Sequence, residues 1–135
     1  MKSFLLVAFI VGAVTAGTLP ASEQQFVNQV HAHCQSNPKT FVDENLLKNL
    51  SANKDNAQVG VHMLCMSKGA GLQGQNGEIN KGAVQSKVAL VIRDSSKVNE
   101  IVNKCAVKTG SWESTAVSMW LCLNKNQVPY TPILN

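Results

Sequence analysis

The sequence predicts an all-α fold, a single domain of about six helices around an internal apolar cavity, with two disulfides. The first observation behind this prediction is that apolar residues recur with helical spacing along most of the chain after residue 21. The second is that all four cysteines fall within these helical segments. The third is the segment 55–71, in which Ala57, Val61 and Cys65 share one side of a helix and Met63 and Met66 the other. A helix with two apolar sides is expected to lie inside the domain.

Residues 1–16, MKSFLLVAFIVGAVTA, have the pattern of a secretory signal peptide: a basic Lys2, an apolar run, and small side chains up to Ala16. The apolar run is too short to span a membrane, and no later run approaches the ~20 apolar residues that a span needs. We therefore expect cleavage after Ala16, no membrane insertion, and a secreted, extracellular domain over residues 17–135.

Two helices are predicted before the 55–71 segment. The first covers residues 22–37 and begins with a capping box formed by Ser22 and Gln25. The second is short and begins at Asp43, where acidic side chains favour the positive end of a helix. Asn49 lies in a formal glycosylation sequon, and the sequence leaves open whether it is modified.

The second half of the chain continues the helical pattern after a Gly- and Asn-rich loop over residues 69–80, which lacks the order of a phosphate-binding loop. A fourth helix is predicted over residues 81–93, although its β-branched residues leave a strand as the alternative. Asp94 or Ser95 can cap a fifth, amphipathic helix. Ser111 is expected to cap the sixth, residues 112–123, which is apolar nearly all round and should be buried. The tail, residues 126–135, contains prolines but is otherwise apolar, and we expect it to pack onto the domain.

The charge pattern excludes nucleic acid as a partner. The net charge of +4 is mild, and the basic residues are scattered singly along the chain. A nucleic-acid-binding surface is expected to show a basic patch with interleaved aromatic residues, and this sequence has neither.

The three histidines do not predict a metal site or an enzyme. His31 and His33 project ~200° apart on a helix, so they cannot bind one ion together. Cys34 and Cys65, the other candidate metal ligands near the histidines, are expected to be oxidised in an exported protein. A nuclease built on two histidines and a lysine is conceivable, but nothing in the sequence positions these groups against a phosphate. We expect no cofactor, no metal and no catalysis, with the histidines on water-exposed helix flanks.

Four cysteines in an exported chain imply two disulfides with three possible pairings. The pairing Cys34–Cys65 would tie the first helix to the third, and Cys105–Cys122 would tie the fifth to the sixth. On the loop-entropy model each would contribute about 3 kcal/mol or slightly more. This is the pairing that we favour.

This arrangement of helices and cysteines resembles the insect odorant-binding proteins. That family usually has six cysteines, the second lying four residues before the third and the fifth nine residues before the sixth. In this chain those two positions hold Val61 and Glu113, so the chain resembles the four-cysteine "minus-C" branch of the family. The resemblance implies the same two bridges that we favour above, together with a helical domain that carries small hydrophobic molecules through aqueous fluid in an apolar cavity.

The candidate ligand-binding residues are apolar positions facing the predicted interior, together with part of the tail. Their flexible methionines suit a wall that meets variable shapes, and losing the bridge between positions 61 and 113 is expected to broaden the range of ligands. The alternative for each residue is ordinary core, and the alternative for the protein is a secreted helical interaction or structural protein with a filled core. The set is Val27, Val30, Met63, Met66, Val84, Val88, Ala116, Met119, Tyr130 and Ile133.

Groups that could orient a ligand through a polar contact are Ser67, Thr115, Ser118 and Tyr130. The histidines titrate near neutrality and could make ligand release sensitive to pH. A receptor partner or a homodimer is left open by the sequence.

Overall fold

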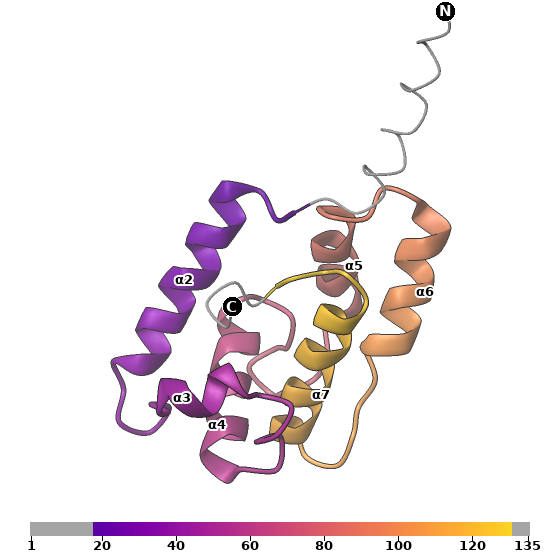
Figure 1. Cartoon of the computed structure of the whole chain (residues 1–135). Helices are drawn as coiled ribbons and strands as arrows, with labels where there is room; N and C mark the ends of the chain where they lie inside the picture. The colour runs from indigo at the N-terminus through magenta and orange to yellow at the C-terminus, as the bar shows by residue number, and fades with distance from the viewer. Residues whose placement is uncertain (1–17, 131–135) are drawn as a thin grey trace, which may run out of the picture.

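The computed structural model of the chain describes residues 18–130, and the predicted signal peptide and Ile133 therefore lie outside the described residues. Over this range the chain forms six α-helices, and Gln73 and Ile79 form an isolated antiparallel β-bridge (Figure 1). The prediction of an all-α fold is confirmed. The helices are α2 (Ala21–Gln35), α3 (Glu44–Lys48), α4 (Ala57–Gly69), α5 (Lys81–Ala89), α6 (Ser95–Cys105) and α7 (Trp112–Lys125).

Side-chain caps explain where most of these helices begin. The side chain of the residue before each of α3 to α7 accepts a hydrogen bond from a backbone N–H of the first turn, which satisfies one of the donors left free at a helix start. Asp94 and Ser111 act in this way, as the sequence predicted. The capping residues are Asp43, Asn56, Asn80, Asp94 and Ser111.

The predicted capping box at the start of the first helix is wrong. α2 begins one residue earlier than expected, at Ala21, and follows Pro20, which has no side-chain cap. The carbonyl of Pro20 already accepts from the backbone N–H groups of Glu23 and Gln24. Ser22 consequently lies inside the first turn and cannot act as the cap.

The fourth predicted helix is real but shorter than expected. α5 ends at Ala89, and Val91 and Ile92 lie in the turn that leads to α6, where both are buried. Asp94 caps α6, and the chain must leave α5 before that point to change direction. The strand alternative for this segment is not adopted.

α4 occupies the middle of the fold. It packs against α2 and α7, while α6 packs against both α5 and α7 (Figure 1). Met63 and Met66 are each 1% exposed, so the methionine side of α4 is buried as predicted. The opposite side is less buried than predicted: Val61 and Cys65 are half-buried and Ala57 is exposed. α2 is bridged to this side near Cys65, which leaves the first turn of α4 open to water.

The two disulfides are Cys34–Cys65, between α2 and α4, and Cys105–Cys122, between α6 and α7. This is the pairing favoured by the sequence and implied by the resemblance. After α7 the chain turns back across the bundle, and Val128 and Tyr130 are buried. No helix within residues 18–130 has the length and apolar character required to cross a membrane.

Candidate functional site

The predicted ligand-binding residues that the structure describes all lie in one apolar cluster. They come from α2, α4, α5 and α7 and from the segment after α7, so residues far apart in the sequence meet in the interior. Val30 is the most exposed of them at 8%, and several have no exposed surface at all. In this structure protein atoms therefore fill the space around the set. The residues without exposed surface are Val27, Val84, Val88, Ala116 and Met119.

Three buried polar atoms have no hydrogen-bond partner among the described residues: Ser67 Oγ on α4, Trp120 Nε1 on α7 and, in the loop before α5, Gln73 Oε1. Ser67 and Trp120 are fully buried. Such unpaired groups are uncommon inside proteins because each loses its bonds to water without replacement. Ser67 was a predicted polar group, whereas Trp120 was not. The signal for Trp120 was available, since it lies on the one helix predicted to be buried all round.

The other predicted polar groups are already engaged or exposed. The Thr115 hydroxyl donates to the backbone carbonyl of Ser111, at 2.8 Å, and accepts from the backbone N–H of Thr109, at 2.9 Å. Ser118 is exposed. The Tyr130 hydroxyl donates to a carboxylate oxygen of Glu23. Ser67 is therefore the predicted polar group whose hydroxyl is buried without a partner among the described residues.

A charged cluster at the edge of the interior fastens the C-terminal segment to α2 and α5. The Lys87 ammonium lies 2.6 Å from the same Glu23 oxygen that accepts from Tyr130. Burial would raise the pKa of Glu23, but the hydrogen bonds from Lys87 and Tyr130 outweigh it, and the pKa is lower than usual. Burial and the Glu23 contact together raise the pKa of Tyr130, so this phenol stays protonated. The Tyr130 ring also packs on Trp120, with centroids 5.3 Å apart.

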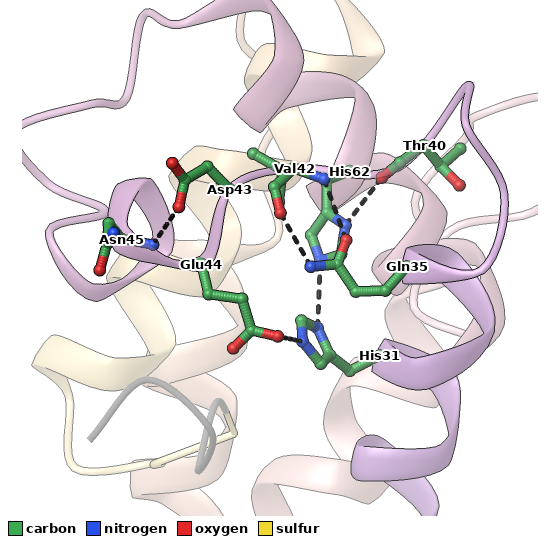
Figure 2. Close-up of polar contacts among 8 residues, drawn as sticks. All are labelled: His31, Gln35, Thr40, Val42, Asp43, Glu44, Asn45 and His62. Atoms are coloured by element: carbon green, nitrogen blue, oxygen red, sulfur yellow. Dashed lines mark hydrogen bonds and ion pairs between the residues drawn. The ribbon is translucent and has the colours of Figure 1, made fainter.

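A second polar cluster joins α2, α3 and α4, and it corrects the prediction for two of the histidines. His31 and His62 are buried, at 8% and 0% exposure, rather than lying on water-exposed flanks. Their rings are in contact, with His31 Nδ1 3.2 Å from His62 Nε2, while His31 Nε2 lies 3.0 Å from Glu44 (Figure 2). His33 is exposed as predicted.

The sequence did contain a signal for this burial. His31 lies three residues before Cys34 and His62 three residues before Cys65, so each histidine shares a helix face with a bridged cysteine. Because the Cys34–Cys65 disulfide brings these two faces together, the two histidines are in contact about one helical turn from the disulfide. Among the described residues, no group of three or more histidine, cysteine or acidic side chains is arranged to hold a metal ion.

One surface hollow lies apart from the predicted interior site. It has a volume of about 810 Å³, opens to solvent between α7 and neighbouring segments, and is lined by both polar and apolar groups. None of the predicted ligand-binding residues lines it. Its lining residues are Ser51, Lys104, Ser118, Leu121, Cys122, Asn124, Lys125 and Asn126.

Six helices, two disulfides that each join neighbouring helices, and an apolar interior containing methionines together define a small disulfide-bridged helical domain. Residues 17–126 match the model of the PBP/GOBP family, and the chain belongs to that family. The resemblance to insect odorant-binding proteins is thus confirmed. At the level of the family, the chain is a binding protein of the odorant- and pheromone-binding type rather than an enzyme.

Two relatives come from the beetle Tenebrio molitor. The chain is 25% identical to the B1 protein over 116 residues, which cover 84% of this chain and 88% of the relative. It is 24% identical to the B2 protein over 116 residues, which cover 84% of this chain and 89% of that relative. No solved structure matches the chain.

Proposed function

We propose that this chain is a secreted carrier that binds small hydrophobic ligands, such as odorants, pheromones or fatty acids, non-covalently in its interior. The observation that carries the proposal is the position of three methionines, Met63 and Met66 on α4 and Met119 on α7, in the same buried cluster as the valines of α2 and α5. Methionine side chains are flexible and can repack around different shapes. Because these residues are enclosed by protein atoms, a ligand must enter by displacing side chains rather than by filling a preformed space.

Ser67 and Trp120 support a polar anchor for such a ligand. α4 and α7 lie side by side and run in the same direction (Figure 1), and Gly60 near the start of α4 lies against Glu113 near the start of α7. Ser67 lies seven residues, or about two turns, after Gly60, and Trp120 lies seven residues after Glu113. Each therefore lies on the face of its helix that carries the Gly60–Glu113 contact, and both are equally far from that contact. The Trp120 N–H can only donate. A ligand with an accepting oxygen, such as an aldehyde, ester or acid, would therefore satisfy it.

The second candidate function is a secreted interaction or structural protein with a filled core. The observation that favours it is the complete enclosure of Val27, Val84 and Met119. The two functions make opposite predictions for uptake of an apolar molecule.

Displacement of a fluorescent apolar probe from the mature protein separates the two functions. A carrier should take up the probe and release it to fatty acids or terpenoid aldehydes with a Kd on the order of micromolar, given ~0.5 kcal/mol per ligand heavy atom for about 15 heavy atoms. Ala116→Phe, which adds a ring to the enclosed interior, should reduce uptake. Ser118→Phe is the matched control, because it adds the same ring to the exposed side of the same helix.

Thermal unfolding of both variants checks that each is folded. Met119→Ala, which removes interior volume, should increase uptake or favour larger ligands. A wild-type protein and a folded Met119→Ala variant that both take up no probe would establish the filled-core alternative.

Secretion is tested separately. Expressed from its full sequence in insect cells, the protein should appear in the medium with Gly17 as its first residue. Retention inside the cells, or an uncleaved N-terminus, would contradict this part of the proposal.

A further inference from the structure

Three consecutive polar contacts cross the junction of α2, α3 and α4 (Figure 2). Glu44 Oε2 lies 3.0 Å from His31 Nε2, His31 Nδ1 lies 3.2 Å from His62 Nε2, and His62 Nδ1 lies 2.9 Å from the Thr40 carbonyl oxygen. The two rings meet edge to face, with planes 77° apart. Every nitrogen of the two imidazoles therefore has a partner at hydrogen-bond distance.

Counting hydrogens shows that two neutral rings cannot make all three contacts. The Thr40 carbonyl can only accept, so His62 Nδ1 must carry a hydrogen. An ionised Glu44 can also only accept, so His31 Nε2 must carry one. A neutral imidazole has a single N–H, which leaves His31 Nδ1 and His62 Nε2 as two bare lone pairs facing each other. Two buried acceptors in that position would be unsatisfied and would repel each other.

We infer that the His31–His62 pair binds one additional proton between His31 Nδ1 and His62 Nε2, and that the α2–α3–α4 junction is fully closed only while that proton is present. His31 is the imidazolium, because it alone contacts the Glu44 carboxylate, whereas His62 has no exposed surface. The inference concerns the fold and does not depend on the proposed carrier function.

The neighbouring groups agree with this assignment. Burial, partly opposed by the Thr40 hydrogen bond, lowers the pKa of His62, which favours its neutral form. The hydrogen bond from His31 lowers the pKa of Glu44, which favours the carboxylate. The titratable groups that act on the pair are Glu44 and, through it, Lys48 on α3, and the two histidines themselves on α2 and α4.

Within residues 18–130, the two nitrogens lack the further ligands that a metal site needs. No third ligand completes such a site among the described residues. A proton fits the 3.2 Å between the two nitrogens.

Losing the proton should loosen the contact of α3 with α2 and α4, while the link between α2 and α4 stays intact. α2 and α4 stay joined by Cys34–Cys65, and the Gln35 side chain keeps its two hydrogen bonds to the backbone of Val42, which do not depend on pH. Glu44 contacts the pair only through His31. The segment released first is therefore α3.

Nitrogen-15 NMR of the imidazoles in the mature protein, titrated from pH 5 to 8.5, tests the inference. At the acidic end His31 should carry hydrogens on both nitrogens and His62 on Nδ1 alone. As the pH rises, both rings should change together, and amide exchange in residues 44–48 should accelerate at the same midpoint. Glu44→Gln, which removes the negative charge but keeps an accepting oxygen, should lower that midpoint by about one pH unit. His33→Gln, at an exposed position on α2, is the matched control and should leave it unchanged.

His62→Phe keeps an aromatic ring but offers no acceptor, so it should also lower the midpoint. It is a second, independent variant in case Glu44→Gln does not fold. A His31 ring with one hydrogen across the whole range would overturn the inference. So would a folded Glu44→Gln variant with the wild-type midpoint, or spectra that change with stoichiometric zinc and revert with chelator.

Discussion

Gly60 of α4 lies directly against Glu113 of α7, so closely that a Cβ atom at Gly60 would stand 3.1 Å from the Glu113 Cβ. Glu113 occupies one of the two positions at which six-cysteine odorant-binding proteins carry the additional bridge, and Val61, the other, is the next residue along α4. The two helices thus make a close backbone approach where this chain has no covalent link.

A larger side chain at Gly60 should separate these helices. Gly60→Val is expected to destabilise the fold by about 1 to 3 kcal/mol, because the added methyl groups overpack the contact with Glu113. Gly82→Val is the matched control at an exposed position near the start of α5, where a Cβ would meet only the Asn80 side chain at 3.6 Å. Urea denaturation of both variants measures the difference, and equal losses would show that the α4–α7 approach has no special importance.

Restoring the bridge should narrow ligand choice. Val61→Cys combined with Glu113→Cys is expected to form a third disulfide and to raise the free energy of unfolding by about 2 to 4 kcal/mol. A stiffer α4–α7 pair should bind fewer members of a ligand panel than wild type. Val61→Ser with Glu113→Ser is the control that changes both residues without a bridge. Mass spectrometry under non-reducing conditions verifies the bridge, and an unchanged panel in the bridged protein would reject the link between the missing disulfide and broad specificity.

The Glu23–Lys87–Tyr130 cluster should matter far more than an exposed ion pair. The side chains of Glu23 and Lys87 are 14% and 21% exposed, so Lys87→Met leaves a mostly buried carboxylate without its cation. This change should lower the free energy of unfolding by about 2 to 3 kcal/mol. Lys97→Met is the control, because its ion pair with Glu100 spans 3.8 Å between side chains that are more than half exposed. That change should cost well under 1 kcal/mol. Thermal or urea unfolding distinguishes the two, and similar losses would contradict this ranking.

The same cluster gives a pH dependence with a definite sign. The pKa of Glu23 is lower in the folded protein than its usual value of 4.5, so the stability it contributes is present above that value and is lost as the pH falls through the folded pKa. Tyr130→Phe removes one of the hydrogen bonds that lower this pKa. The variant should therefore differ most from wild type near neutral pH, and the two unfolding curves should converge in acid. A difference that stays constant from pH 7 to pH 3 would contradict the assignment.

The turn before α5 depends on Gly77 in two ways. Its φ of +93° is unfavourable for other residues, and a Cβ there would collide with the Trp112 ring. Gly77→Ala should thus lower the free energy of unfolding by more than the ~1 kcal/mol expected from backbone strain alone. Gly71→Ala isolates that strain, because Gly71 has a φ of +82° but no atom within 4 Å of the added Cβ. Comparable unfolding midpoints for the two variants would show that the Trp112 contact is unimportant.

Local signals predicted most of the fold, and the failures occurred where tertiary contacts decided the outcome. Caps at Asp94 and Ser111 follow from hydrogen bonds within one turn and were predicted correctly. Pro20 replaced Ser22 at the start of α2 because a backbone carbonyl was already in place. α5 ended early because the chain has to turn before α6, which is not encoded in propensities.

The candidate site was predicted in part for the same reason. Apolar spacing identified the buried valines and methionines, because burial repeats along a helix. Contacts between distant polar residues have no such repeat. Tyr130 and Glu23 are 107 residues apart, and His31 and His62 are 31 apart, so their pairing required the arrangement of the helices.

The contact between Tyr130 and Glu23 also brings the last described residue beside the first turn of the first helix. The backbone could therefore be joined there by a short linker and reopened at the exposed residues 74–76, giving a circular permutant with the same helix neighbours and the same two disulfides. Such a rearranged chain would carry both new ends on an exposed loop tip, where reporter groups could be attached.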